Sequence, residues 1–394
     1  MKKIYKYSFK ISVMKICAVL LILICSCRMN NKDNVGDNDY TSFKINVDHI
    51  CDSCNNTIKY AEFIPLEFND HAILNGIDKI IYSGENLIVF DKRQRQVIIF
   101  DAVGKFHAKI QKYGKGPNEY TFPSDIIFYQ KENKIGILDQ NKGSIIWFNL
   151  DGSALSIDNI SREKLILGQA FVWNDQIYHF IHNPKAGKNS YQFNITDINL
   201  RKINYSMFKS EPSQISNLNM HPFGIYNNNL TLHIPNDQCI YQIKQKKISK
   251  LFYFDFIDKN LPEKLLKKML SEEQNATQKQ IINYNKEIFD FVIVKTVVPL
   301  KDFIFLEITH KFQNLCVLIN LKDNSSHVFR NNIGRFSLGK YLACQQDKNI
   351  VYFEIPTTQI DKYNSRQIKN INIVGKELSK NLMHNNPWIL KVQL

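Results

Sequence analysis

Two stretches of the chain share one pattern: residues 77–91 read IDKIIYSGENLIVFD, and residues 124–139 read SDIIFYQKENKIGILD. Both place Glu-Asn between two runs rich in β-branched and aromatic residues. After one inserted residue, the match continues at a constant offset through Asp91 and Asp139, Phe100 and Phe148, and Gly104 and Gly152. Each unit therefore contains three or four short strands separated by turn residues, which is typical of a blade of a β-propeller.

Beyond the second unit the turn residues no longer match, but the rhythm of short strands continues. We expect four further strand pairs: QIYHFI with YQFNIT, LTLHI with CIYQI, FIFLEI with LCVLIN, and YLACQ with IVYFEI. One insertion interrupts this rhythm near Pro262, which suits a first helical position and precedes an apolar stripe at Leu265, Leu266, Met269 and Leu270. This predicts a short helix that packs on the propeller or, alternatively, binds a partner.

Both ends of the folded region alternate apolar and polar residues, as half-buried strands do. The alternation runs through Ile58, Tyr60, Ile64 and Leu66 at one end, and through Trp388, Leu390, Val392 and Leu394 at the other. Pairing of the two ends in one blade would close a ring and protect strand edges that are otherwise exposed. Residues 61–394 allow roughly 56 residues per blade for six blades, within the usual range of four to eight blades.

The first 26 residues carry five lysines and no acidic residue. Within them, an uninterrupted apolar run over residues 16–24 comes directly after the last of these lysines. This run is too short to span a bilayer of about 30 Å, so it predicts an export signal. The sequence that follows, ICSC, resembles a bacterial lipobox, with the small Ser26 directly before Cys27. We therefore expect lipidation at Cys27, with an ordinary secretory signal as the alternative.

Residues 28–42 are rich in Asn and Asp and almost free of apolar residues, which predicts a flexible tether. The expected organisation is a lipoprotein signal peptide over residues 1–26, a lipid-anchored tether over residues 27–57 and a propeller domain over residues 58–394. Cys51 and Cys54 form a CxxC within the tether. In an exported protein they favour a structural disulfide or inert thiols over a redox or metal pair, since one CxxC lacks the four ligands of a structural zinc site.

Composition excludes several classes of protein. The 394 residues include 26 Phe and 18 Tyr but only 15 Gly and 8 Cys, which excludes a disordered chain, a collagen-like chain and a small disulfide scaffold. The formal net charge is +14, and five of the surplus positive charges lie in the signal peptide. The remaining positive charge is what a moderately Lys-rich and Asn-rich composition gives, so it does not by itself indicate an acidic partner. Export also disfavours nucleic acid as a partner.

Several segments together resemble the NHL repeat and the six-bladed β-propeller lipoproteins of Bacteroides-type bacteria. They are IPLE (64–67), IDKIIY (77–82), GKGPNEY (114–120), IIWFNLDG (145–152), QCIYQI (238–243), LPEKLL (261–266) and NPWILKVQL (386–394). The resemblance implies an all-β fold, namely a six-bladed β-propeller with four-stranded antiparallel blades and a short helical insertion. It also implies an exported lipoprotein of the cell envelope, most simply at the outer membrane, but no settled activity.

In NHL-like blades, the loop after the outer strand and the turn between the second and third strands emerge on one face. The resemblance therefore implies one candidate binding face formed by Lys92, Arg93, Arg95, Lys115, Glu119, Tyr120 and Lys142. A cationic, Tyr-bearing face suits an anionic or carbohydrate ligand or an envelope protein. The alternative is that Asp91 and Asp139 cap tight turns, and that the GxGPxEY segment only shapes a connection.

The sequence contains no GxSxG, HExxH, GxxxxGK[ST] or helix-opening GxGxxG motif, so we assign no catalytic residues, metal ligands or cofactor. His179 and His182 form an HxxH, but in a strand these residues point to opposite faces. The expected protein is a monomeric, lipid-anchored binding module that touches the membrane only through its lipid and binds no nucleic acid. The alternative is a channel-centred, metal-dependent hydrolase or lyase of the NHL-like type.

Overall fold

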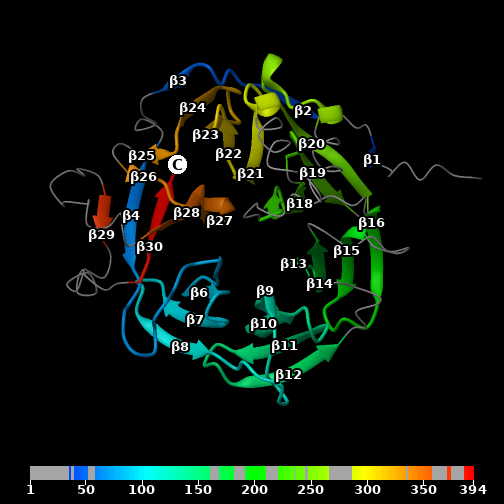
Figure 1. The fold of residues 1–394 in the computed structure, drawn as a ribbon, viewed down its shortest axis with the longest axis vertical. Coiled ribbons are helices and arrows are strands. Elements are labelled where there is room, and N and C mark those ends of the chain that lie inside the picture. Colours follow the sequence, from blue (N-terminus) through cyan, green and yellow to red (C-terminus); the bar gives the residue numbers. More distant parts are fainter. Residues whose placement is uncertain are drawn as a thin grey trace, which may run out of the picture.

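The structure is a computed structural model. It describes residues 35–36, 40–51, 58–159, 168–181, 191–209, 221–234, 236–244, 247–265, 286–333, 336–356, 371–373 and 386–394. In these residues the chain forms six antiparallel blades arranged as a ring, which confirms the predicted six-bladed all-β fold (Figure 1). Apart from short helical turns, the described elements are strands.

The blades are numbered here in chain order. Blade 1 consists of β5 (Lys79–Tyr82), β6 (Asn86–Asp91), β7 (Gln96–Asp101) and β8 (Phe106–Ile110), and blade 2 of β9 (Pro123–Tyr129), β10 (Lys134–Asp139), β11 (Ser144–Asn149) and β12 (Ala154–Asn159). Blade 3 consists of β13 (Gln169–Trp173), β14 (Gln176–Phe180), β15 (Tyr191–Asp197) and β16 (Ile203–Lys209). Blade 4 consists of β17 (Phe223–Tyr226), β18 (Asn229–His233), β19 (Cys239–Lys244) and β20 (Lys247–Asp255).

Blade 5 consists of β21 (Ile293–Pro299), β22 (Phe303–His310), β23 (Gln313–Asn320) and β24 (Ser326–Arg330). Blade 6 combines β27 (Tyr341–Gln345), β28 (Ile350–Ile355) and β30 (Trp388–Gln393) with β4 (Tyr60–Pro65) from the other end of the chain. The remaining strands are a small hairpin of β25 (Asn332–Ile333) and β26 (Phe336–Ser337), and β29 (Ile371–Ile373), which pairs with β4. The four strand pairs expected from the sequence all form, as β14 with β15, β18 with β19, β22 with β23, and β27 with β28.

The repeated residues of blades 1 and 2 perform the same structural tasks. Asp91 accepts the backbone N–H of Asn75 at 2.7 Å, and Asp139 accepts that of Thr121 at 2.6 Å, so each carboxylate ties the incoming loop to a turn. Gly104 and Gly152 both adopt positive φ, +91° and +85°, at which a side chain would also meet a backbone carbonyl. The residues that the two units share are therefore those that form and stabilise the turns between strands.

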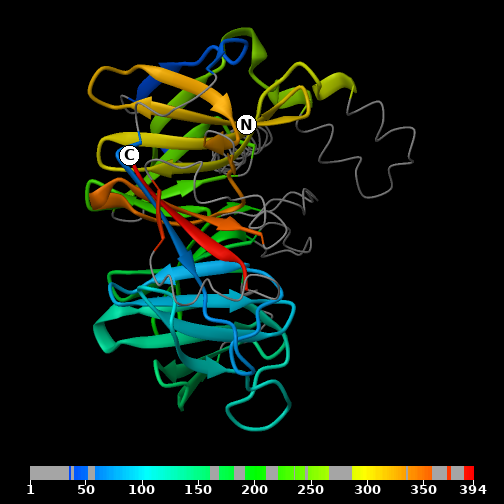
Figure 2. The ribbon, with the colours of Figure 1, turned by 90° about the vertical axis from the view of Figure 1, so that its left-hand side faces the viewer.

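The ring closes where the sequence predicts it. β4 and β30 pair antiparallel over six residues, from Trp388 opposite Pro65 to Gln393 opposite Tyr60 (Figures 1 and 2). Phe63 and Trp388 are almost completely buried, and their rings meet edge to face at 5.9 Å. Both faces of the central strands are covered by neighbouring blades, so β6 and β7 read as nearly continuous apolar runs.

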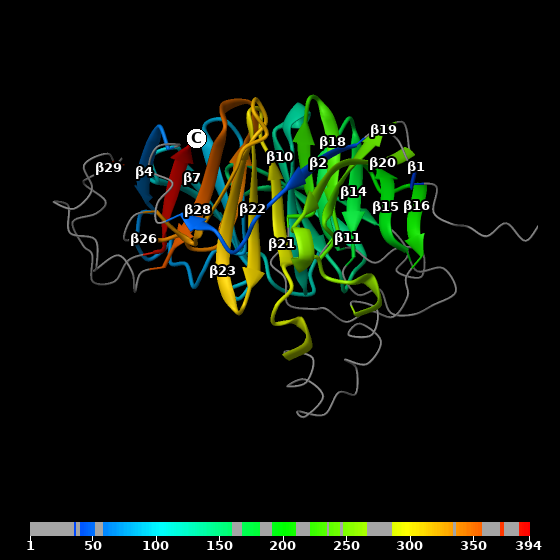
Figure 3. The same cartoon turned by 90° about the horizontal axis from the view of Figure 1, so that it is seen from above.

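The N-terminal segment corrects the predicted boundary between tether and propeller. β1 (Val35–Gly36) and β2 (Thr41–Lys44) pair parallel with β20, and β3 (Ile50–Cys51) pairs parallel with β24. We call residues 35–51 the strap, and Figure 3 shows its blue ribbon running across the outer edges of blades 4 and 5. Phe43, Ile45 and Val47 are 0 to 3% exposed, so the prediction of a flexible tether over residues 27–57 is wrong for this part.

Three other predictions fall wholly or partly outside the described residues. The signal peptide and Cys27 lie outside them, as do Leu266, Met269 and Leu270 of the expected helix, whose first turn is described over residues 263–265. Cys51 forms no disulfide with another described cysteine, and Cys54 lies outside the described residues, so their pairing stays a prediction. Among the described helical segments, none has the length and apolar character needed to cross a bilayer.

If the strap belongs to the folded body, Ile45→Ala lowers the free energy of unfolding by about 2–5 kcal/mol, since it removes a fully buried side chain. Lys44→Ala, at the neighbouring exposed position of β2, is the matched control and is expected to change it by less than about 0.5 kcal/mol. Urea unfolding followed by tryptophan fluorescence measures both values. Equal, small effects of the two substitutions would show that the strap contributes nothing to stability.

Candidate functional site

A cavity of about 1250 Å³ occupies the centre of the ring. The innermost strands of five blades line it, namely β5, β9, β13, β17 and β27. Because each four-stranded blade has the same antiparallel order, these inner strands all run in the same direction. We therefore call the end at which they begin the first mouth, and the end at which they finish the second mouth.

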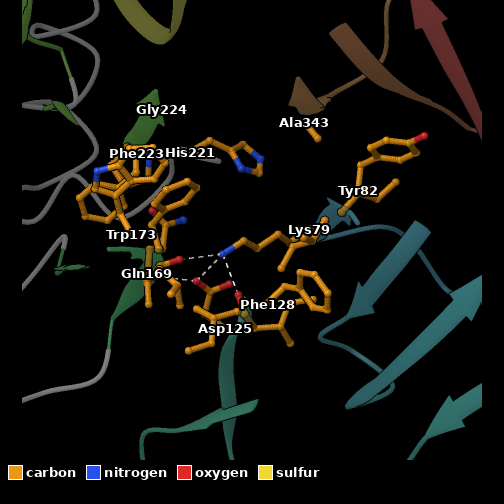
Figure 4. Close-up of a pocket in the computed structure, with 18 of the residues that line it drawn as sticks. Lys79, Tyr82, Asp125, Phe128, Gln169, Trp173, His221, Phe223, Gly224 and Ala343 are labelled. Atoms are coloured by element: carbon orange, nitrogen blue, oxygen red, sulfur yellow. Dashed lines mark hydrogen bonds and ion pairs between the residues drawn. The ribbon is translucent and has the colours of Figure 1, made fainter. Parts of the chain in front are cut away.

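An ion pair joins three inner strands at the first mouth. Lys79 Nζ lies 2.8 Å from Asp125 Oδ2 and also donates to the carbonyl oxygens of Ile126 and Ala170, at 2.9 and 3.1 Å (Figure 4). The same Asp125 oxygen accepts the backbone N–H of Ala170 at 2.8 Å. The inner strands present an unpaired edge to the cavity, and this pair satisfies backbone groups on that edge in blades 2 and 3.

A second lysine links blade 6 to blade 1. Lys340 Nζ donates to the carbonyl oxygens of Ile77 and Asp78, both at 3.2 Å. Burial lowers the pKa of Lys340, while nearby carboxylates, including those of Asp78 and Glu354, oppose the shift. Lys79 and Lys340 are thus both engaged by groups of the protein.

His221 also lines the first mouth, just before β17, and its ring meets that of Tyr341 edge to face at 5.0 Å. Burial, together with the ammonium groups of Lys79 and Lys340, lowers the pKa of His221 to about 3. The imidazole is therefore neutral at physiological pH, and one ring can both donate and accept a hydrogen bond.

Aromatic rings from four inner strands surround the rest of the cavity. Tyr82, Phe128 and Trp173 lie towards the second mouth, at or near the ends of β5, β9 and β13, and Phe171 and Phe223 pack 6.2 Å apart further in. These rings are half-buried, so each keeps part of its surface towards the cavity. Figure 4 shows Tyr82, Phe128, Trp173 and Phe223 around the space that Lys79 and Asp125 enter.

Polar groups flank the second mouth. Lys131 pairs with Asp175 at 3.0 Å, and the Tyr129 hydroxyl donates to the same carboxylate at 2.6 Å. Burial and the Asp175 hydrogen bond raise the pKa of Tyr129 to about 12, so this hydroxyl remains a donor. Asn174 and Asp175 form the tight turn after β13 with positive φ values of 49° and 57°, a conformation in which Asn and Asp are enriched.

The structure brings the predicted binding residues together at the first mouth, but several of them stabilise the loops. Tyr120 is fully buried and donates to the Arg95 carbonyl at 2.6 Å. Glu119 accepts the backbone N–H of Gly116 at 2.7 Å, while Lys142 Nζ donates to the Glu119 carbonyl at 2.6 Å. These contacts agree with the alternative in which the GxGPxEY segment shapes a connection.

The other predicted residues form a basic rim. Arg93 and Lys115 are exposed, and the Arg95 guanidinium stacks over the ring of Tyr113 at 4.2 Å. Lys92 also lines the cavity, as does Gln140 of the turn that carries Lys142. We call Lys92, Arg93, Arg95 and Lys115 the basic rim.

Apart from Lys92, the binding residues predicted from the sequence do not include those that line the cavity. The strand register shows that Lys79 and Asp125 occupy the same position in blades 1 and 2, because Lys79 pairs with Phe90, Asp125 pairs with Leu138, and these partners lie 48 residues apart. The alignment of the two sequence units, which places Asp78 opposite Asp125, does not reveal this equivalence. Trp173 and His221 lie in blades where the repeat is too diverged to align.

The histidines and acidic residues bear on the alternative of a metal-dependent hydrolase or lyase. In the part of the chain that the structure describes, no three His, Cys, Asp or Glu side chains lie together as metal ligands. His179 of the HxxH motif is fully buried in β14, with Nε2 3.1 Å from Thr196 Oγ1, and His182 lies outside the described residues. The described residues thus give no support to the hydrolase or lyase alternative.

The fold and the site define a six-bladed β-propeller with a large central cavity lined by aromatic residues. The chain belongs to the family described as "Domain of unknown function (DUF4934)", whose model matches residues 43–393. The match begins within β2, in agreement with the strap being part of the folded body. No curated protein matches the chain.

Two solved structures from Bacteroides share the fold. A candidate exported protein of Bacteroides fragilis is 15% identical, with a TM-score of 0.71 over 90% of this chain and 99% of that one. A member of the DUF4221 family from Bacteroides vulgatus is 12% identical, with a TM-score of 0.54 over 85% of this chain and 96% of that one. At these identities the similarity concerns the fold alone.

Asp125→Ala is expected to lower the free energy of unfolding by about 3–5 kcal/mol, because it leaves the Lys79 ammonium without its carboxylate and the Ala170 N–H without its acceptor. Lys131→Ala breaks the solvent-exposed pair with Asp175 and is expected to cost no more than about 1 kcal/mol. Chemical denaturation of the three proteins compares these values. A loss for Asp125→Ala as small as that for the exposed pair would contradict a structural role for the inner ion pair.

The buried His179 predicts a dependence of stability on pH. Burial lowers its pKa to about 3 in the folded protein, against about 6.5 when unfolded, so below pH 6.5 the unfolded chain takes up a proton that the folded chain does not. The contribution of neutral His179 to the free energy of unfolding is therefore fully present above pH 6.5. It falls by about 1.4 kcal/mol per pH unit as the pH is lowered from 6.5 towards 3. His179→Gln should make the slope shallower by that amount, while the exposed His107→Gln is the control. Identical slopes for His179→Gln and the parent protein would refute this origin.

Proposed function

We propose that this protein is a lipid-anchored binding module of the cell envelope, and that its ligand occupies the central cavity. The observation that carries the proposal is the cavity itself, which is larger than the roughly 300–1,000 Å³ of a usual small-molecule pocket and has half-buried aromatic rings along its wall. Partly exposed rings beside hydrogen-bonding groups are typical of a binding site.

Export is supported by the N-terminal signal sequence and by the shared fold of the candidate exported protein from Bacteroides fragilis. Because the ICSC sequence resembles a lipobox, we propose that the lipid is attached to Cys27 and that the protein is located at the outer membrane. The basic rim is proposed as a second contact at the first mouth, since Lys92 belongs both to this rim and to the cavity wall. It suits a ligand or an envelope protein that carries negative charge outside the cavity.

Blocking the cavity tests the binding function. Ala343→Trp places a large side chain into the cavity from β27, whereas Leu155→Trp adds the same side chain at an exposed position of β12. Each purified protein is incubated with small molecules extracted from bacterial envelopes and examined by native mass spectrometry. The parent and Leu155→Trp proteins should retain a bound mass that Ala343→Trp loses. A bound mass retained by all three proteins, or by none, would contradict binding in the cavity.

The anchor is tested by growth with an alkyne-bearing fatty acid, followed by fluorescent labelling of the protein. Cys27→Ala should lose the label and leave the membrane fraction, because no lipid is attached. Cys25→Ala, two residues away, is the matched control and should keep both label and location. A labelled Cys27→Ala protein, or loss of the label from Cys25→Ala alone, would place the anchor elsewhere.

A further inference from the structure

We propose that the cavity binds a segment of an uncharged saccharide chain, stacked on Tyr82, Phe128 and Trp173. This inference rests on the proposed function and names the chemistry of the ligand. It follows from three properties of the described cavity wall, which are its charge balance, its aromatic surfaces and its supply of amide groups.

The wall carries no net charge. Four lysines and four aspartates line it, and His221 is neutral. Several of these charges are also engaged: Lys79 with Asp125, Lys131 with Asp175, and Lys340 with two backbone carbonyls. An ionic ligand that enters the cavity loses bound water, but these engaged groups cannot offer it a free opposite charge in return. Binding of an ionic ligand is therefore disfavoured.

The aromatic rings offer flat apolar surfaces on three neighbouring blades. Tyr82 ends β5, Phe128 lies one residue before the end of β9, and Trp173 ends β13, so the three rings lie at similar depth near the second mouth. Each is half-buried and lines the cavity, and the ring of Tyr82 stacks on that of Tyr352 with centroids 6.0 Å apart, so a ligand can reach no more than one of its faces. The axial C–H groups of a pyranose ring form an apolar face of matching size, and Tyr and Trp are suited to a ligand that is apolar on one side and wet on the other.

The polar part of the wall suits hydroxyl groups. Seven amide side chains line the cavity, including Gln169, Asn174 and Asn228, and each amide has both donors and acceptors. A sugar hydroxyl also donates and accepts, so it can pair with amide groups such as those of Asn174 and Asn228, whereas a planar hydrocarbon offers an amide no hydrogen bond. An extended peptide would need a continuous strand edge, but Lys79 and Asp125 already occupy backbone groups of β9 and β13 at the first mouth.

Intrinsic fluorescence reports on this site directly. The chain has three tryptophans, of which Trp147 and Trp388 are 0% and 4% exposed, whereas Trp173 lines the cavity. The bound material of the cavity-blocking experiment is first analysed by tandem mass spectrometry. Maltohexaose, xylohexaose, N-acetylchitohexaose and, as a charged counterpart, hexagalacturonate are then titrated into the parent protein, with fluorescence and calorimetry as readouts.

We expect the bound mass to fragment by successive loss of neutral monosaccharide units, and a neutral hexasaccharide to change the tryptophan fluorescence. Trp173→Ala should weaken binding at least about tenfold, Trp173→Phe should restore most of it, and Tyr82→Ala should weaken it similarly. Phe312→Ala removes an exposed ring outside the cavity, at 61% exposure, and should leave the affinity unchanged. Thermal unfolding of each variant confirms that it is folded.

The possible failures are distinguishable. A cavity-bound mass that proves to be a peptide, a lipid or an acidic glycan, or stronger binding of hexagalacturonate than of the neutral oligosaccharides, overturns the saccharide proposal and leaves the binding module intact. Neutral binding that Trp173→Ala and Tyr82→Ala do not weaken overturns the aromatic site. Absence of any bound mass that Ala343→Trp removes overturns the proposed function itself.

Discussion

The pairing of β4 with β30 is the constraint on which the rest of the molecule depends. A strand from the beginning of the domain becomes the outer strand of a blade whose other three strands come from its end, so the ring is completed by hydrogen bonds between distant parts of the chain. Without this pairing, blade 6 would leave β30 as an unprotected edge, and blade 1 would lose the contacts that Ile64 of β4 makes in the core shared by the two blades. Closure also arranges the inner strands around one centre, where those of five blades form the wall of the cavity.

A ring of six blades leaves backbone groups unpaired at its centre, and the chain satisfies some of them with charged side chains. Lys79 and Asp125 are held by carbonyl and N–H groups of neighbouring inner strands, and Lys340 links the loop before β5 to blade 6. Charged groups in this position stabilise the ring and leave the wall without net charge. The aromatic residues nearer the second mouth then dominate what the cavity offers to a ligand.

Much of the fold could be predicted from the sequence, because blades 1 and 2 repeat their turn residues and the chain ends alternate as strands. The candidate site could not, since inner-strand residues such as Trp173 and His221 meet only when six diverged blades are arranged in a ring. Phe43, Ile45 and Val47 show a different limit: their alternation is genuine but short, and it follows a polar stretch that reads as a tether. Pairing with the outer edge of β20 makes Thr41–Lys44 a strand.

The strap has a mechanical consequence. It runs parallel to β20 and then to β24 before the chain reaches β4, so a force applied at its N-terminal end pulls along these strands. Inter-strand hydrogen bonds that lie across the direction of pulling share the load in shear and do not open one after another. A pull on the chain from this end would therefore be resisted first by the strap, and the strand pair that closes the ring would be protected from that load.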